Sequence, residues 1–141
     1  WTLDAKTQGW RSDEPGSVIA FEVDGTAILS MHHVIKRAMG KAQVQVDGGA
    51  PVILDGWFSG TWGGYRSTSL LAKDLKPGKH VVRIELLAEK NSGSDGHAFT
   101  LYGLGAAGVA ARCAGPGFGK KPHARHRAQC SKMSVPRGLT R

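Results

Sequence analysis

Short segments of alternating apolar and polar residues, each ended by a turn dipeptide, constrain the fold of this chain more than any other feature. In the middle of the sequence Val44 and Val46 alternate with glutamines, and a second apolar run follows Asp47-Gly48. Alternation gives a strand one buried face, and Asp-Gly supplies the positive-φ positions of a tight hairpin turn. Residues 42–54 are therefore predicted to form a β-hairpin.

The same pattern recurs along most of the chain. Further strand candidates, bounded by Gly, Pro, Asn and Asp turns, lie at residues 17–24, 26–35, 67–72, 80–88 and 97–104. Residues 28–39 could be read as a helix, but β-branched residues and nearby turns favour a strand. About seven short strands favour an all-β antiparallel β-sandwich over residues 17–105. The pattern alone fits jelly-roll and immunoglobulin-like topologies equally.

The alternation also predicts the core and the start of the ordered domain. Five side chains have the inward parity of their strands and are expected to be buried: Phe21, Val44, Val46, Ile84 and Phe99. In the 26–35 strand, the apolar residues Ala27, Leu29, Met31 and Ile35 share one parity. Residues 1–16, which end in the turn signal Glu14-Pro15-Gly16, are predicted to be an irregular lead-in.

The positive charge belongs to the C-terminal part of the chain. Residues 1–108 hold 11 of the 19 Lys and Arg and all 11 Asp and Glu, which leaves 8 basic residues and no acid beyond them. That C-terminal part is rich in Gly, Pro and basic residues and poor in large apolar ones. Residues 106–141 are therefore predicted to be a disordered basic tail, with an altered reading frame or a retained intron as its other possible origin. No specific nucleic-acid partner is predicted, because no RNA-binding motif accompanies the charge.

Cysteine and histidine residues offer only weak metal-site candidates. Cys113, His123, His126 and Cys130 are four possible zinc ligands, but their spacing matches no known zinc motif. Two free thiols or one disulfide are the alternatives. His32 and His33 would point to opposite faces of a strand, so they are not expected to share a metal. No metal and no cofactor are predicted.

The sequence contains no block that would make the chain an enzyme. There is no G-x-S-x-G elbow, and the run Ser94-Asp95-Gly96-His97 is explained as a polar loop entering a strand. No apolar run reaches the roughly 18 residues of a membrane span. Because the chain begins at Trp1 without a Met or signal pattern, it is expected to be a processed form or a piece of a longer protein.

A glycine-rich aromatic loop at residues 55–67 is the predicted ligand site. Trp57, Trp62 and Tyr65 are predicted to be stacking surfaces for sugar rings, with Asp55 and Arg66 as polar partners. Trp and Tyr suit carbohydrates because each joins an apolar body to a polar tip. The alternative is that Trp57 or Trp62 covers the open end of the core.

An ordered series of short motifs links the chain to a family. The series comprises Gly9-Trp10, Glu14-Pro15-Gly16, Met39-Gly40-Lys41-Ala42, Val46-Asp47-Gly48, Lys76-Pro77-Gly78-Lys79-His80 and Gly96-His97-Ala98-Phe99. Over residues 8–105 it resembles the jelly-roll β-sandwich module that accompanies SGNH/GDSL-type esterases acting on polysaccharides. The resemblance implies a neighbouring catalytic domain, a role in carbohydrate recognition, and an extracellular or secretory location. The chain lacks a Gly-Asp-Ser-Leu segment, so esterase activity is not implied for it.

Two hypotheses follow from the sequence. In the first, the chain is a non-catalytic carbohydrate-binding accessory module whose partners are a polysaccharide or glycan and an SGNH/GDSL-type catalytic domain. In the second, it is a structural interdomain packing module with no ligand of its own, and its aromatic residues are buried against the catalytic neighbour.

Overall fold

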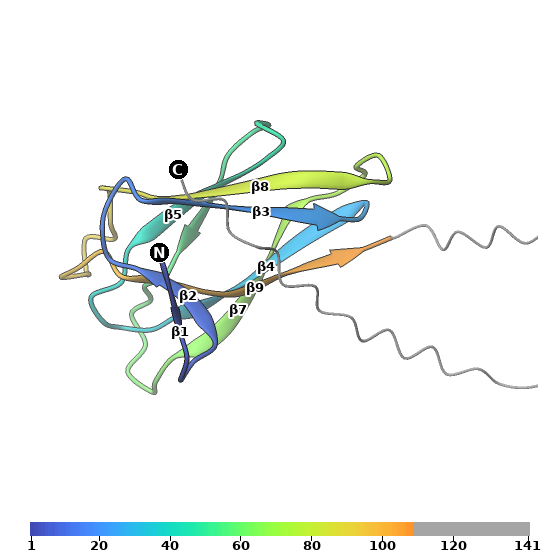
Figure 1. The fold of residues 1–141 in the computed structure, drawn as a ribbon. Helices are drawn as coiled ribbons and strands as arrows, with labels where there is room; N and C mark the ends of the chain where they lie inside the picture. Colours follow the sequence, from blue (N-terminus) through green and yellow to red (C-terminus); the bar gives the residue numbers. More distant parts are fainter. Residues whose placement is uncertain (109–141) are drawn as a thin grey trace, which may run out of the picture. The chain divides into compact units, whose positions relative to one another are not determined.

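The computed structural model describes residues 1–108 and consists there of nine strands without a helix (Figure 1). None of these residues belongs to a helix long and apolar enough to cross a membrane. The strands are β1 (Thr2–Asp4), β2 (Gly9–Ser12), β3 (Val18–Asp24), β4 (Ala27–Val34), β5 (Lys41–Val46), β6 (Val52–Asp55), β7 (Tyr65–Ala72), β8 (Lys79–Leu86) and β9 (Phe99–Ala107).

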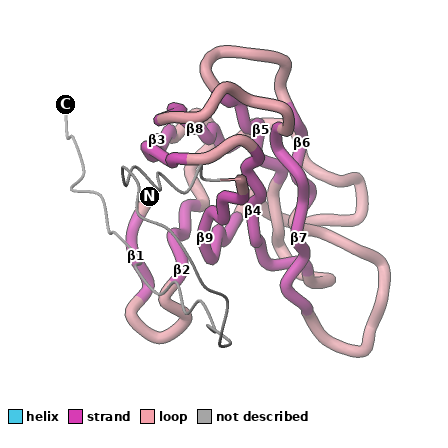
Figure 2. The backbone as a smooth tube through the Cα atoms, turned by 90° about the vertical axis from the view of Figure 1, so that its right-hand side faces the viewer, coloured by secondary structure: helices cyan, strands magenta, loops and turns pink. Residues whose placement is uncertain are grey.

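The strands form two antiparallel sheets that lie face to face. One sheet has five strands in the order β1-β2-β9-β4-β7, and the other has four in the order β3-β8-β5-β6. Figure 2, which looks along the strands, shows the two rows. The predicted all-β antiparallel sandwich is confirmed. Every paired strand within the sheets is antiparallel, and one parallel bridge joins Met39 to Ala98 outside them.

The central hairpin forms where the sequence predicts it. β5 pairs with β6 in a register that puts Val44 opposite Val52. The turn between them contains two residues with positive φ, Asp47 at 51° and Gly48 at 69°. This conformation is easily reached by Gly and tolerated by Asp, which is why the Asp-Gly signal identified the turn correctly.

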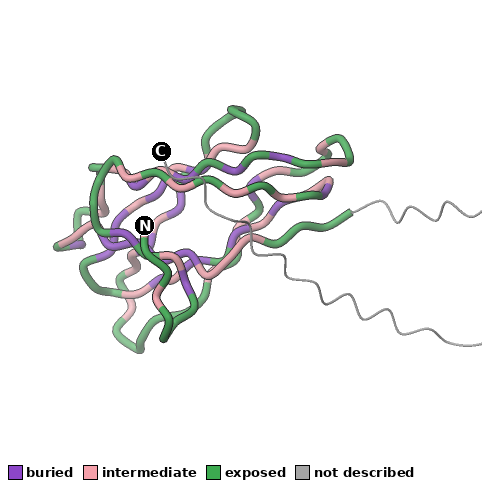
Figure 3. Tube along the Cα trace, in the orientation of Figure 1, coloured by how far each residue is buried: buried purple, intermediate pink, exposed green. Residues whose placement is uncertain are grey.

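The core lies between the two sheets, where the buried residues gather (Figure 3). Val44, Ile84 and Phe99 are almost completely buried, as predicted. Phe21 and Val46 are only partly buried and pack against the core from its margin. For Phe21 the reason is topological, because β3 is an edge strand with a neighbour on one side only.

The inner face of β4 is not its more apolar face. Ile28, Ser30, His32 and Val34 are buried, whereas Leu29 is half-buried and Met31 is exposed on the opposite side. The His32 ring stacks on Phe99 with 5.5 Å between ring centroids. A β-strand can thus bury polar side chains when a core aromatic ring covers them, and hydropathy alone does not reveal this.

The lead-in at residues 1–16 is not irregular, contrary to the sequence prediction. It contains β1 and β2, and β2 pairs with β9 so that Trp10 lies opposite Leu101. Trp10 packs edge-on against Phe21 at 6.0 Å. Strands of three and four residues are too short to show alternation, and their position depends on pairing with a strand about 90 residues away.

The predicted C-terminal boundary is also displaced. β9 extends to Ala107, past the predicted strand end at residue 104 and into the segment predicted as tail. The rest of the predicted disordered basic tail lies outside the described residues. The same holds for the candidate zinc ligands Cys113, His123, His126 and Cys130.

Candidate functional site

Two of the sequence motifs that carry the family resemblance meet in space at one junction. The Asp47 carboxylate lies 2.5 Å from His80 Nδ1 and accepts a second hydrogen bond from the Val81 amide at 2.8 Å. His80 Nε2 donates to the Lys76 carbonyl oxygen at 2.8 Å. Both ring nitrogens therefore face acceptors, which only the doubly protonated imidazolium satisfies. The hydrogen bond to Asp47 raises the pKa of His80, and the same bond lowers the pKa of Asp47.

Two further motifs pack against each other at the loop-rich end. The Gly40 amide donates to the Ala98 carbonyl oxygen at 2.7 Å, and a Cβ on Gly40 would lie 2.3 Å from the His97 carbonyl oxygen. No larger residue fits there without moving the backbone. These four motifs of the series therefore make contacts with one another within the fold.

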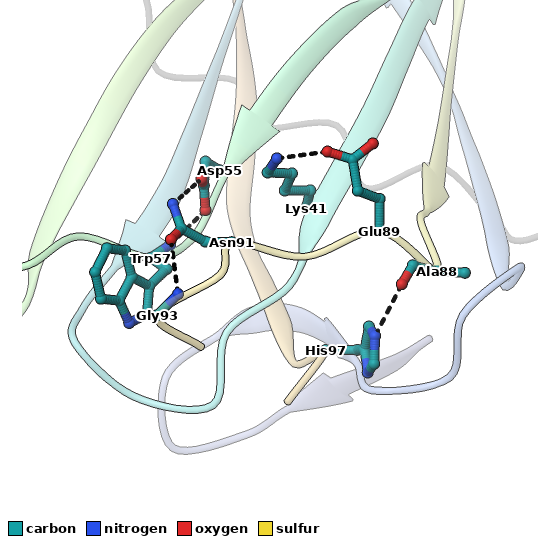
Figure 4. Close-up of polar contacts among 8 residues, drawn as sticks. All are labelled: Lys41, Asp55, Trp57, Ala88, Glu89, Asn91, Gly93 and His97. Carbon is teal, nitrogen blue, oxygen red and sulfur yellow. Dashed lines mark hydrogen bonds and ion pairs between the residues drawn. The ribbon is translucent and has the colours of Figure 1, made fainter. Parts of the chain in front are cut away.

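In the Ser94-Asp95-Gly96-His97 run, the serine and histidine side chains contact backbone carbonyl oxygens. The buried Ser94 hydroxyl lies 2.6 Å from the Met39 carbonyl oxygen and 3.2 Å from that of Arg37. His97 Nε2 is directed instead at the Ala88 carbonyl oxygen, at 3.0 Å (Figure 4). The hydroxyl is engaged by backbone carbonyls, and the neighbouring imidazole contacts a different segment.

The first half of the aromatic loop is tied to the loop between β8 and β9. Asp55 Oδ1 accepts a hydrogen bond from the Trp57 amide at 2.9 Å, and Oδ2 accepts one from Asn91 Nδ2 at 3.0 Å (Figure 4). The Trp57 indole covers Gly93, where a Cβ would lie 2.4 Å from the ring. Asp55 and half-buried Trp57 therefore connect two loops.

The rest of the loop builds a group of three rings, half-buried Phe58 and exposed Trp62 and Tyr65, which we call the aromatic cluster. Phe58 lies edge-on to both other rings, with centroid distances of 5.2 and 5.3 Å. Trp62 and Tyr65 stack at 5.7 Å with 21° between their planes. Trp62 is 71% exposed and Tyr65 41% exposed.

Glycine makes the aromatic cluster possible at two positions. A Cβ on Gly60 would lie 2.3 Å from the Phe58 ring and 2.9 Å from Trp62 Nε1. Gly63 has a φ of 114°, which side-chain-bearing residues rarely adopt. The rings are thus held by the backbone of the loop rather than by contacts with the core.

Arg66 lies apart from the aromatic cluster. On β7 it pairs with His33, whereas Tyr65 pairs with buried Val34, so the two side chains leave opposite faces of the sheet. The Arg66 guanidinium sits 4.5 Å above the Tyr102 ring. Of the five predicted site residues, the structure brings Trp62 and Tyr65 together. It adds Phe58, which supports both rings and was not among the predicted ligand residues.

His32 and His33 lie on opposite faces of β4, as the sequence predicts. His32 is buried, and desolvation lowers its pKa. His33 lies on the other face, where its Nδ1 is hydrogen-bonded to the Tyr102 hydroxyl at 2.5 Å. Across residues 1–108 no three His, Cys, Asp or Glu side chains come close enough to hold a metal ion.

Neither protein-family models nor curated protein sequences match this chain, but solved structures do. A two-domain esterase (CEX) active on acetylated mannans, co-crystallized with mannopentaose, matches 69% of the chain at 25% identity and a TM-score of 0.59. A family two carbohydrate esterase from Cellvibrio japonicus matches 73% at 17% identity and a TM-score of 0.51. A Paenibacillus xanthan lyase matches 77% at 16% identity and a TM-score of 0.52.

These neighbours are carbohydrate-active enzymes of which this chain resembles one part. The matches cover 27% of each esterase and 11% of the lyase. At 16–17% identity, the second esterase and the lyase show a shared fold only. The chain thus spans about a quarter of the length of the esterases it matches.

Proposed function

We propose that this chain is a non-catalytic, jelly-roll-like carbohydrate-binding module that accompanies an SGNH/GDSL-type esterase, and that the aromatic cluster contacts the glycan. The observation that carries the proposal is the stacked, solvent-exposed pair Trp62 and Tyr65. The two-domain esterase CEX, of which this chain matches about a quarter, supports an association with polysaccharide deacylation.

The geometry of the cluster suits a sugar ring. Pyranose rings present C–H faces, which pack against the faces of Trp and Tyr. Because the rings of the cluster contact one another, little side-chain freedom remains to be lost when a ligand binds. Aromatic contacts contribute on the order of 1 kcal/mol each. A surface of two rings should therefore bind oligosaccharides weakly, with Kd values of about 0.1–10 mM.

Asp55 and Arg66, the polar partners predicted from the sequence, are not part of the proposed glycan site. Both oxygens of Asp55 accept hydrogen bonds from the protein, and Arg66 lies over Tyr102 on the outer face. On the stacked rings themselves, the groups that can hydrogen-bond to a sugar are the indole N–H of Trp62 and the hydroxyl of Tyr65.

The competing function is that of an interdomain packing module. Its supporting observation is apolar exposure beyond the cluster, since Met31 is 39% exposed and Leu70 51% exposed on the outer face of the five-stranded sheet. In this case a catalytic domain, rather than a glycan, would cover the exposed side chains.

An NMR titration of the 141-residue chain separates the two functions. Mannopentaose and cellopentaose are the first probes, and the variants are Trp62→Ala and Tyr65→Ala. Leu70→Ala, an exposed apolar truncation on β7, is the matched control. We expect saturable binding by the wild type and the control and about fivefold weaker binding by both cluster variants.

Equal binding by the wild type and both cluster variants would place the site elsewhere. The absence of any oligosaccharide response, combined with protection of Trp62 by a separately added SGNH/GDSL-type esterase domain, would favour the packing function.

A further inference from the structure

A cavity of about 600 Å³ lies at the loop-rich end of the five-stranded sheet, and its lining includes no residue of the aromatic cluster. The β1–β2 turn, the segment after β4 and the segment before β9 form its walls. Its charged and polar lining includes Asp4, Arg11, Asp13, His33, Arg37 and Tyr102. The volume is in the range of small-molecule sites, about 300–1,000 Å³.

Three arginines lie near His33, and two of them, Arg11 and Arg37, line the cavity themselves. Arg11, Arg37 and Arg66 are each close enough to His33 to lower the pKa of its imidazole, although desolvation is the larger cause of that shift. Within residues 1–108 none of the three forms an ion pair, whereas Arg83 on the other sheet binds Glu85 at 2.7 Å. The segment beyond residue 108 has no Asp or Glu that could serve as a partner.

Arg11 and Arg37, the two arginines that line the cavity, retain most of their hydrogen-bonding capacity. Arg11 makes one long contact, 3.5 Å from Nη1 to Thr100 Oγ1. A guanidinium has five N–H donors arranged in a fork that matches the two oxygens of a carboxylate. Two such groups in the lining of one cavity offer donors that a ligand carboxylate can bind.

The same cavity also carries carboxylate acceptors. Asp4 and Asp13 both line it. Asp4 Oδ1 accepts the amides of Lys6 and Thr7 at 2.8 and 3.3 Å, which lowers the pKa of this carboxyl group and keeps it ionised. An ionised carboxylate in the wall accepts hydrogen bonds from hydroxyl groups.

From this lining we propose that the cavity binds a sugar acid, that is, a uronic acid residue with one carboxylate. Arg11 and Arg37 hold the ligand carboxylate, and Asp4 and Asp13 accept hydrogen bonds from its hydroxyl groups. A neutral sugar lacks a carboxylate for the two guanidiniums, and a fully ionised inorganic anion such as sulfate offers the two aspartates no donor. A uronic acid supplies both groups on one ring of suitable size.

The proposal is tested by NMR titration of the 141-residue chain with D-glucuronate and D-galacturonate. D-glucose, D-galactose and acetate are the comparison ligands. We expect saturable shifts of the His33 imidazole and the Arg11 side chain with at least one uronate. Each neutral sugar and acetate should bind at least about tenfold more weakly, because each lacks one half of the recognised chemistry.

Variants identify the residues responsible. Arg37→Gln and Arg11→Gln should each weaken uronate binding by about tenfold or more, since each removes a charged donor pair. Arg83→Gln is the matched control, because this arginine lies on the other sheet and already has an acidic partner. Trp62→Ala should leave uronate binding unchanged, so this result is independent of whether the aromatic cluster binds glycans.

Three results would overturn the proposal. The first is the absence of a saturable shift at His33 with either uronate. The second is equal binding of uronate by the wild type, Arg11→Gln and Arg37→Gln. The third is binding of acetate as tight as that of the uronates, which would assign the cavity to a carboxylate side chain of a neighbouring protein domain.

Discussion

Trp57 and Trp62 lie five residues apart in one loop, and their surroundings differ completely. Trp57 covers Gly93 beside the hydrogen bonds that Asp55 makes, and it is half-buried. Trp62 stacks on Tyr65 and is 71% exposed. The comparison shows that aromatic density in a loop does not by itself indicate a binding surface. Partners elsewhere in the chain decide which rings are structural and which remain available to a ligand.

Substitutions in the core should lower the free energy of unfolding more than any substitution in the two parts of the loop. Phe99 is fully buried and contacts both Trp1 and His32. We expect Phe99→Ala to lower the free energy of unfolding by about 3–5 kcal/mol in urea denaturation, because it leaves a cavity among rigid neighbours. Phe21→Ala, at the margin of the core, should cost less. An equal loss for the two variants would contradict the assignment of β3 as an edge strand.

The structural half of the loop should show the next largest effect. Asp55→Ala removes the acceptors of Trp57 N–H and of the Asn91 side chain. We expect a loss of about 1–3 kcal/mol in the free energy of unfolding, together with a change in Trp57 fluorescence. Asn91→Ala serves as the control, since it breaks only the bond to Asp55 Oδ2 and the one to the Gly93 amide. An Asp55→Ala variant as stable as the wild type would indicate that Asp55 is available to a ligand after all.

A pH dependence should distinguish the Asp47–His80 junction from the aromatic cluster. The pKa of His80 is raised in the folded state, so its stabilising contribution is complete below about pH 6.5 and is lost as the pH rises through the folded value. The pKa of Asp47 is lowered, so its contribution is lost when the pH falls through its folded value. Protonation of buried His32 also lowers the stability at acidic pH, because desolvation lowers its pKa.

The loss of stability as the pH rises through and above neutrality is therefore the most direct measure of the Asp47–His80 junction. In thermal unfolding measured between pH 6 and 9, Asp47→Asn should flatten the decline in Tm that the wild type shows. A wild-type Tm that is constant over this range would mean that His80 is not held as an imidazolium.

The smallest effect on stability is expected in the aromatic cluster. Trp62→Ala should change the free energy of unfolding by no more than about 0.5 kcal/mol, because the ring is mostly in solvent. Trp57→Ala should cost clearly more, since its indole packs on Gly93. Urea denaturation of the two variants side by side makes this comparison. Equal losses would remove the distinction between the two halves of the loop.

The sequence predicts the sandwich and its long strands because alternation and turn chemistry are local signals. The β5–β6 hairpin and the buried face of β8 follow from them directly. The sequence does not predict β1 and β2, because both are short, and because β2 pairs with the distant β9 while β1 pairs with β2. Nor does hydropathy reveal that Ser30 and His32 face the core, because the stacking of His32 on Phe99 is a contact across 67 residues of sequence.

The candidate site is predictable to a similar degree. The glycine and aromatic density correctly identifies a loop that exposes Trp62 and Tyr65. The separation of Asp55 and Trp57 from them depends on Asn91 and Gly93, which lie in another loop. The Arg-lined cavity likewise joins Arg11 and Arg37 from distant positions, so no local motif marks it.

The most direct test of the account compares the two indole N–H signals in one NMR titration of the wild-type chain with mannopentaose. We predict that the Nε1–H resonance of Trp62 shifts saturably, with a Kd in the millimolar to high micromolar range, while that of Trp57 moves little. An equal shift of both signals, or a shift of Trp57 alone, would contradict the proposal that the aromatic cluster is the glycan-binding part of the loop.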